Sequence, residues 1–310
     1  MTVGTAVTRS IHGVAVDAGS GLAAALGEAR GTAAEPGDLL EFKRAVLTTL
    51  GPSASTVLVD ATCGPDLLAD YPHGCEPMMA FEADVYHISD ADRMTVLPEK
   101  LRVADYPGMG VKQLKFFMYY APDDHPEINA RKLDLVEQVG AACAEHGLQF
   151  LMEPLVYDPL TVPGTMEFAL AKPELVRRAT ETFADPRFRA SVLKVEVPVD
   201  LAFVEGFGDA ALSHTQALDA FRSAAQAAGD VPLVYLSAGV PFDWFRASLE
   251  MAREAGVEFA GFMCGRAIWS DAIDHFGRAG EDGLRDWLSN VGRSRLLQLI
   301  NTLEGPAVGK

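Results

Sequence analysis

The feature that most constrains this chain is a repeated alternation of short apolar runs with longer helical patterns. Eight runs rich in branched or aromatic residues, each bounded by turn-forming residues, are candidate strands. They cover residues 13–17, 55–60, 78–83, 113–120, 149–156, 191–198, 232–239 and 259–267. Most of these runs are continuously apolar, which is typical of parallel strands covered on both faces. The pattern therefore predicts an α/β fold with a parallel sheet.

Helical patterns separate these runs, and the clearest one covers residues 127–147. In it Ile128, Leu133 and Val136 recur at helical spacing, and Gly147 supplies a left-handed stop. Similar patterns lie near residues 173–184, 213–228, 242–256 and 270–289. Strand alternating with helix eight times predicts a single (β/α)8 TIM barrel, with an active site at the carboxyl ends of the strands.

A doubly wound open sheet is the alternative fold. Such a sheet usually has fewer strands and carries a glycine-rich phosphate turn after the first one. The turn at residues 17–21, Asp-Ala-Gly-Ser-Gly, matches that fingerprint only weakly. We therefore predict one barrel domain over residues 1–310, ending in a short mobile tail from about residue 304.

Charge and cysteine content argue against several classes of partner. The chain has 43 acidic against 26 basic side chains, a net charge of -17, which disfavours nucleic acid and anionic lipid. Its four cysteines form no disulfide framework, and neither they nor the seven histidines have metal-ligand spacing. No apolar run approaches the roughly 18 to 20 residues of a membrane span, and the amino-terminal segment is unlike a signal peptide. We expect a cytoplasmic protein without a metal, a cofactor or a membrane partner.

Two lysines lie inside strand patterns, where charged side chains are unusual. Side chains alternate across a strand, so Lys194 and Glu196 share one face while Leu193 and Val195 share the other. The helix-facing surface of a barrel is apolar, so the charged face is predicted to point inward. Desolvation there favours a neutral amine, whose lone pair can attack a carbonyl group. Lys194 is therefore a candidate Schiff-base lysine.

The second of these lysines is Lys115, which shares its face of the run 113–120 with Phe117 and Tyr119. Two cations in one barrel interior would repel each other, which further favours the neutral form of the more buried amine. A purely structural alternative exists, in which Lys194 pairs with Glu196 and Lys115 pairs with Glu153.

Glu153 is a third ionisable residue within a strand pattern. The adjacent Pro154 indicates that the strand is ending there, near the catalytic rim of a barrel. A carboxylate at this position can accept the hydroxyl proton of a substrate during carbon–carbon cleavage and assist carbinolamine dehydration. A structural barrel carboxylate is the alternative.

The last two strand runs end in sequences suited to phosphate binding. In many barrels the loops after strands seven and eight bind phosphate. Gly239 and Gly265 allow backbone N–H groups to approach phosphate oxygens, Ser237 adds a hydroxyl, and Arg266 adds a planar cation. Gly-Arg pairs also close ordinary turns, so this signal is of moderate specificity.

Five co-linear motifs connect these residues with a known family. They are VKQLKFFMYY, FLMEPLVYD, VLKVEVPVDLAFVEGF, VYLSAGV and FMCGRAIW. In these motifs and their order, from about residue 10 to about residue 300, the chain resembles the class I tagatose-1,6-bisphosphate aldolases and the related sulfofructose-phosphate aldolases. The resemblance implies a cofactor-free lyase that cleaves a phosphorylated ketose, such as tagatose 1,6-bisphosphate, into dihydroxyacetone phosphate and an aldehyde.

The resemblance also implies roles for individual residues. Lys194 would form the Schiff base and Glu153 would be the acid-base group. The implied substrate-binding residues are Asp17, Lys115, Ser237, Gly239, Gly265 and Arg266, with Ser237 and Arg266 on a phosphate. Glu82 matches a family glutamate to which we assign no role at this point.

One departure concerns the first strand end. These families usually continue the first aspartate as Asp-Gln-Arg, whereas this chain reads Asp17-Ala18-Gly19-Ser20. The polar and cationic side chains are absent, so the distal recognition group can differ from a second phosphate, or another loop can supply the charge. The residues therefore do not specify tagatose bisphosphate or the stereochemistry at C4.

Three other functions stay open from the sequence. The chain could be an aldolase for a different ketose phosphate such as a sulfosugar phosphate, or a phosphate-binding isomerase or transferase that forms no imine. It could also be a barrel that has lost catalysis and binds a ligand. Barrel enzymes of this kind often associate, so a homo-oligomer is compatible with the chain, although no sequence feature fixes an interface.

Overall fold

Eight parallel strands form a closed barrel in this protein, and each strand pairs with its neighbours in chain order. The computed structural model describes residues 10–35 and 37–305. The strands are β1 (Ile11–Val16), β2 (Thr56–Val59), β3 (Glu76–Ala80), β4 (Gln113–Tyr120), β5 (Gln149–Val156), β6 (Val192–Glu196), β7 (Leu233–Leu236) and β8 (Gly261–Cys264). Pairing of β1 with β8 closes the ring. The predicted (β/α)8 barrel is confirmed.

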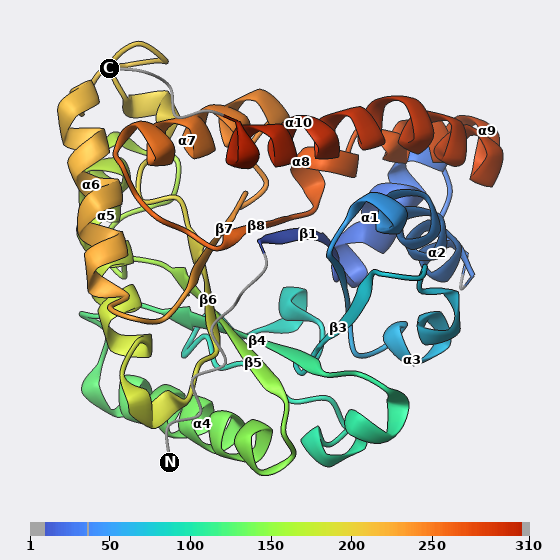
Figure 1. Ribbon diagram of the computed structural model, residues 1–310, viewed down its shortest axis with the longest axis horizontal. Helices are drawn as coiled ribbons and strands as arrows, with labels where there is room; N and C mark the ends of the chain where they lie inside the picture. Colours follow the sequence, from blue (N-terminus) through green and yellow to red (C-terminus); the bar gives the residue numbers. More distant parts are fainter. Residues whose placement is uncertain (1–9, 36, 306–310) are drawn as a thin grey trace.

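Helices cover most of the outside of this barrel (Figure 1). They are α1 (Ser20–Arg30), α2 (Asp38–Leu50), α3 (Gly64–Leu67), α4 (Pro126–Glu145), α5 (Met166–Phe183), α6 (His214–Ala227), α7 (Phe242–Glu254), α8 (Arg266–Trp269), α9 (Ala272–Trp287) and α10 (Arg293–Glu304). Large aromatic side chains such as Phe42, Phe221 and Phe245 are fully buried in the layer between helices and strands. The continuous apolar runs of the sequence result from burial on both faces of each strand.

A second, smaller apolar cluster fills the inside of the barrel. Its members are Ala15, Leu58, Met78, Ala80, Leu151, Val192, Val234 and Met263. Two of them stand two residues before a charged residue of the same strand, Leu151 before Glu153 and Val192 before Lys194. Because side chains repeat on one face every second residue, the apolar layer lies directly below a charged layer at the carboxyl ends. The fold thus places the charged groups on a rigid apolar base.

One helix start differs from the prediction. Helix α5 begins at Met166, not near residue 173, and Pro173 lies inside it. The N-cap is Thr165, whose hydroxyl accepts a hydrogen bond from the N–H of Phe168 at 3.3 Å. A proline is normally a sign of a first helical turn because its ring opposes an interior position. Here burial of the apolar face on both sides of Pro173 sustains the helix through it.

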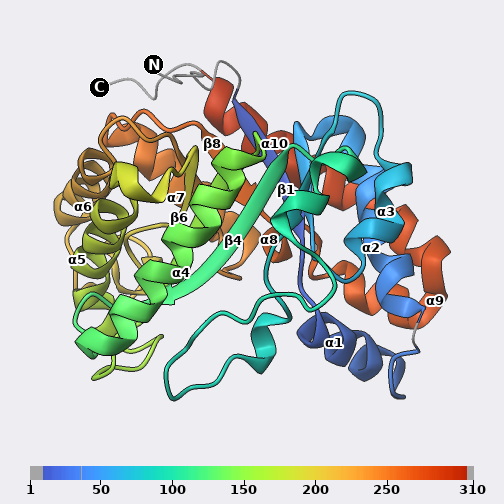
Figure 2. The ribbon, with the colours of Figure 1, turned by 90° about the horizontal axis from the view of Figure 1, so that it is seen from below.

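The connection between β3 and β4 contains no α-helix, which is a second departure from the expected alternation. It holds three short 3-10 turns, η3 (Val85–His87), η4 (Val103–Asp105) and η5 (Pro107–Met109), and part of this teal segment lies beside α1 (Figure 2). Buried hydroxyls anchor it to the barrel: Tyr106 donates to the carbonyl of Ala80, and Thr95 donates to that of Phe117, each at 2.6 Å.

The predicted mobile tail falls mostly outside the described residues, because helix α10 ends at Glu304 and residues 306–310 are not described. The extent of the single domain over residues 1–310 likewise stays a prediction. Among the helices of the described residues, none combines the length and the apolar character needed to cross a lipid bilayer.

Candidate active site

One cavity of about 890 Å³ opens at the carboxyl ends of the strands. All eight residues that the sequence singled out for catalysis or substrate binding line it. They are Asp17, Lys115, Glu153, Lys194, Ser237, Gly239, Gly265 and Arg266. Glu82, which has no role from the sequence, lines the same cavity. The fold therefore gathers these groups from seven strands or strand ends into one site.

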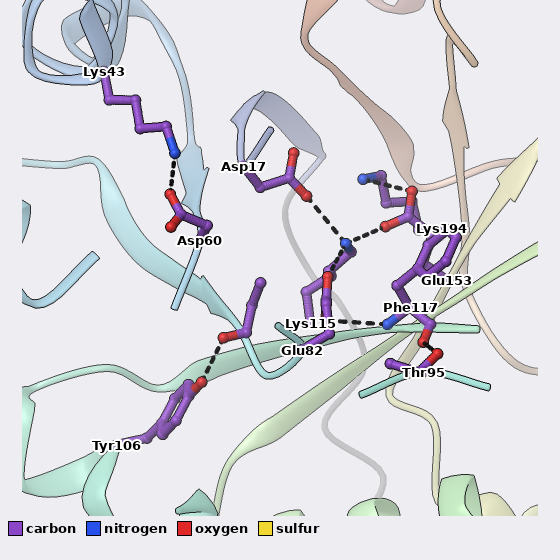
Figure 3. Close-up of polar contacts among 11 residues, drawn as sticks. Asp17, Lys43, Asp60, Glu82, Thr95, Tyr106, Lys115, Phe117, Glu153 and Lys194 are labelled. Atoms are coloured by element: carbon purple, nitrogen blue, oxygen red, sulfur yellow. Dashed lines mark hydrogen bonds and ion pairs between the residues drawn. The ribbon is translucent and has the colours of Figure 1, made fainter. Parts of the chain in front are cut away.

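Glu153 lies between the two lysines and forms an ion pair with each of them (Figure 3). Its Oε1 is 2.9 Å from Nζ of Lys194, and its Oε2 is 2.8 Å from Nζ of Lys115. The three side chains come from the neighbouring strands β4, β5 and β6 and are buried. A shared carboxylate thus compensates the repulsion that was expected between the two ammonium groups.

Lys115 is surrounded by carboxylates. Besides Glu153 it contacts Glu82, and its Nζ is 3.0 Å from Oδ2 of Asp17. Burial lowers the pKa of an amine, but the charges of Glu153, Glu82 and Asp17 outweigh it and raise the pKa of Lys115 well above its ordinary value. Lys115 therefore stays a cation, which makes it unsuitable as a nucleophile.

The two carboxylates on the far side of Lys115 respond in opposite directions. Burial raises the pKa of Asp17, but the charges of Lys115 and Lys194 outweigh it and hold that pKa well below its usual range. Burial raises the pKa of Glu82 to about 7 despite the opposing charge of Lys115. Near neutral pH, Asp17 is therefore ionised, while Glu82 is partly protonated.

The purely structural alternative, in which each lysine only forms an ion pair, is observed for one of the two predicted pairs. Lys115 does pair with Glu153, but Lys194 pairs with Glu153 and not with Glu196. Glu196 accepts a hydrogen bond from the N–H of Val156 at 2.8 Å, and its Oε1 is 3.6 Å from Nζ of Lys172 on α5. The carboxylate of Glu196 is therefore already satisfied away from Lys194.

The loops after β7 and β8 meet at the rim of the cavity. A side chain at Gly239 would place its Cβ 2.9 Å from the guanidinium of Arg266, and one at Gly265 would collide with the carbonyl of Ala15. Ala238 has a left-handed φ of 48°, a conformation that costs energy for a residue other than glycine. The buried Ser237 and the exposed Arg266 flank this crowded turn. The geometry suits an anion held by backbone and side-chain donors.

Sequence reasoning missed several residues of the cavity wall. Arg93 lies in the β3–β4 connection, where no periodic pattern marks it, and Lys172 precedes the proline that was taken as a helix start. Tyr157 follows β5 directly and lines the wall beside them. The motif FLMEPLVYD contains Tyr157, so the tyrosine was the one residue of this set with a usable signal.

Comparison with known proteins identifies the class. A sequence model of the DeoC/LacD family aldolases matches residues 12–271. The chain is similar to the tagatose 1,6-diphosphate aldolase of Listeria monocytogenes serotype 4a (strain HCC23), with 33% identity over 96% of this chain and 88% of the relative. It is also similar to the tagatose 1,6-diphosphate aldolase of Staphylococcus aureus (strain MSSA476), with 35% identity over 86% of this chain and 82% of the relative.

Solved structures support the fold. Fructose-bisphosphate aldolase from Plasmodium falciparum, in complex with TRAP and an inhibitor, matches with a TM-score of 0.72 at 13% identity, covering 98% of this chain and 93% of that one. A Schiff-base-forming fructose-1,6-bisphosphate aldolase matches with a TM-score of 0.57 at 15% identity, covering 91% and 94%. The barrel and the sequence matches together make this chain an aldolase, a carbon–carbon lyase. Within that class, it belongs to the DeoC/LacD aldolase family.

The raised pKa of Glu82 predicts that folding stability falls between about pH 4.5 and about pH 7. In that range the folded state binds a proton at Glu82 that the unfolded state has released. The stabilisation is therefore complete below the unfolded pKa and is lost as pH rises through the folded one. The free energy of unfolding is measured with urea at roughly pH 5 and pH 7.5. Its decrease between these two pH values should be smaller for Glu82→Gln than for the wild type. Equal losses would contradict the assignment.

Proposed function

We propose that this aldolase cleaves a phosphorylated ketose through an imine on Lys194, with Glu153 transferring protons. The observation that carries the proposal is the 2.9 Å contact between Nζ of Lys194 and Oε1 of Glu153. The same cavity is lined by Ser237 and Arg266, from the loops whose sequence is suited to phosphate binding. Lys115 does not compete for this role, because three carboxylates hold it as a cation.

The Lys194–Glu153 pair supplies both partners of imine formation. Transfer of a proton from the ammonium of Lys194 to Glu153 leaves a neutral amine, which attacks C2 of the ketose. The resulting carbinolamine loses its hydroxyl as water when Glu153 returns the proton. The products of this step are an iminium ion on Lys194 and an ionised Glu153, ready to act as a base.

Cleavage of the C3–C4 bond follows, with the iminium group as the electron acceptor. Glu153 takes the proton of the C4 hydroxyl, the C3–C4 bond breaks, and its electron pair enters the iminium group to give an enamine. C4 leaves as the carbonyl of an aldehyde. Glu153 returns its proton to C3 of the enamine, and water hydrolyses the imine to release dihydroxyacetone phosphate and free Lys194.

The charges around the reacting carbons suit this sequence of steps. Lys115 remains an ammonium group 2.8 Å from Glu153, so its charge and hydrogen bond hold that carboxylate in position beside Lys194. Asp17 is also ionised, which gives the cavity an acceptor for a sugar hydroxyl. The C1 phosphate is assigned to Ser237, Gly239, Gly265 and Arg266, which line the same end of the cavity and could supply a hydroxyl, backbone N–H groups and a guanidinium.

The names of the relatives supply the substrate class. Because the Listeria and Staphylococcus relatives are named tagatose 1,6-diphosphate aldolases, we take tagatose 1,6-bisphosphate as the first compound to test. Mass spectrometry after incubation is expected to detect dihydroxyacetone phosphate together with a triose phosphate aldehyde. Conversion of the ketose into an isomer of equal mass, with no triose phosphate, would instead indicate an isomerase and contradict the proposal.

Glu153→Gln is expected to lower turnover by about 10²- to 10⁴-fold, because the amide cannot accept the C4 hydroxyl proton. A borohydride adduct with dihydroxyacetone phosphate should still form on Lys194, but more slowly, since that lysine remains in place. Steady-state cleavage and timed trapping together measure the two effects. Turnover within tenfold of the wild type would exclude Glu153 as the proton-transfer group.

A further inference from the structure

Two cations along the cavity wall have no carboxylate partner. Five lysines and arginines line the cavity, and three of them, Lys115, Lys172 and Lys194, form ion pairs with acidic side chains. Among the described residues, no carboxylate lies within ion-pair distance of the other two, Arg93 and Arg266. Arg266 is already assigned to the C1 phosphate, so the charge of Arg93 has no role in the mechanism given above.

Arg93 and Arg266 reach the cavity from different parts of the barrel. Arg266 follows β8, whereas the guanidinium of Arg93 stacks 4.2 Å from the ring centre of Tyr157 and 5.6 Å from that of Tyr119. Tyr119 belongs to β4 and Tyr157 follows β5. In a ring of eight strands in chain order, β4 is opposite β8, and the strand that carries Lys194, β6, lies between them. In this strand order, a ketose whose C1 end is held after β8 and whose C2 is bound to Lys194 on β6 can continue toward β4, whose Tyr119 Arg93 contacts.

Arg93 is held in place before any ligand binds. Its φ of 48° is left-handed, which for an arginine requires support from the surrounding structure. The backbone N–H of Arg93 donates to the carbonyl of Ser89 at 2.9 Å, and its guanidinium stacks on Tyr157, whose hydroxyl accepts a hydrogen bond from Lys132 at 2.8 Å. The preceding residue, Asp92, forms an ion pair with Arg131 of α4 at 3.3 Å. A planar guanidinium fixed in this way is suited to bind a tetrahedral oxyanion through two oxygens.

The turn after β1 cannot supply this contact, because an acidic side chain occupies it. Oδ2 of Asp84 accepts a hydrogen bond from the N–H of Ser20 at 2.5 Å, at the start of helix α1. A Cβ at Gly19 would lie 2.6 Å from that carboxylate oxygen, and one at Gly21 would collide with the ring of Tyr86. The glycines let the segment that carries Asp84 and Tyr86 pack against the turn. A substrate anion at this place would be repelled by Asp84.

We propose that Arg93 binds a second tetrahedral oxyanion, a phosphate or a sulfonate, at the end of the ketose distal to the C1 phosphate. This inference rests on the proposed aldolase function and adds the residue that binds the distal charged group of the substrate. The cation comes from the β3–β4 connection, which also covers the turn after β1. The paired lysines of the cavity are not available for this contact, since each already compensates a buried carboxylate.

The test compares substrates that differ only at the distal end. Cleavage of tagatose 1-phosphate, tagatose 1,6-bisphosphate and 6-deoxy-6-sulfotagatose 1-phosphate is measured for the wild type, Arg93→Met and Arg93→Lys. Arg93→Met is expected to lower kcat/KM for the preferred doubly charged ketose by about 10- to 150-fold, mainly through KM, as loss of one charged hydrogen-bond donor predicts. For the 1-phosphate the change should stay within about twofold. Arg93→Lys should be intermediate, because it keeps the charge and loses the planar fork.

The matched control is Lys100→Met, which removes an exposed cation from the same connection outside the cavity. It should leave all three substrates unchanged. Equal losses on the singly and doubly charged ketoses with Arg93→Met, or a wild-type enzyme that does not prefer a doubly charged ketose, would overturn the assignment of Arg93. Failure of dihydroxyacetone phosphate to form a borohydride adduct with the wild type would instead refute the aldolase mechanism itself. The preferred doubly charged substrate identifies the group as phosphate or sulfonate.

Discussion

Lys194→Met is expected to abolish carbon–carbon cleavage, with turnover falling by a factor on the order of 10⁴ or more. Methionine fills a similar volume in the barrel but has no amine, so neither the iminium electron sink nor the enamine can form. A coupled assay for dihydroxyacetone phosphate, run at high enzyme concentration, measures the residual rate. A rate within about tenfold of the wild type would show that Lys194 is not the nucleophile.

A matched control distinguishes loss of the reactive amine from unfolding of the barrel. Lys112→Met removes an exposed amine just before β4 and should leave turnover unchanged. In Lys194→Met the Glu153 carboxylate keeps its ion pair with Lys115, so the free energy of unfolding should change much less than in the variant discussed next. Far-ultraviolet circular dichroism and urea unfolding of both variants check that the barrel is intact.

Lys115→Met is expected to destabilise the fold by about 3 to 5 kcal/mol, the largest loss predicted for one substitution in this chain. Lys115 is the one cation in contact with all three of Asp17, Glu82 and Glu153 in the described structure. Removing it leaves buried carboxylates whose desolvation is no longer compensated. Urea unfolding at neutral pH measures the effect, and Lys112→Met should stay within about 0.5 kcal/mol of the wild type.

The loss in Lys115→Met should also depend on pH in a defined direction. Without the ammonium group, the folded-state pKa of Asp17 and that of Glu82 both rise, so the folded state binds more protons than the unfolded one above the unfolded pKa values. Stability of the variant relative to the wild type should therefore fall as pH rises from about 4 to about 7. A difference that is constant across this range would mean that Lys115 acts through packing and not through charge.

The barrel could be predicted from the sequence because its signal is local. Each parallel strand is buried on both faces and so appears as a continuous apolar run, which needs no knowledge of the neighbouring strand. The same reasoning placed Lys115, Glu153 and Lys194 inside the barrel, because a charge within such a run has no other place to point. The boundaries of β4 and β5 agree with the predicted ranges 113–120 and 149–156.

The pairing of charges could be predicted only in part from the sequence, since the pair of Lys115 with Glu153 is present but that of Lys194 with Glu196 is not. Which carboxylate faces which amine depends on how the strands are staggered around the closed barrel, and no local pattern carries that information. Because Lys194 and Glu196 share a face of one strand, the sequence suggested that they pair. In the staggered barrel Lys194 instead forms an ion pair with Glu153, and Glu196 forms one with Lys172 of α5. Arg93 was missed for a related reason, since the long connection that holds it has no periodicity.

Trapping with borohydride tests the central proposal most directly. The protein is incubated with dihydroxyacetone phosphate and sodium borohydride, its intact mass is measured, and the adduct is located by peptide mapping. We expect one adduct per chain, on the peptide that contains Lys194, and none in Lys194→Met. No adduct on a folded wild-type protein, or an adduct located on Lys115, would contradict it.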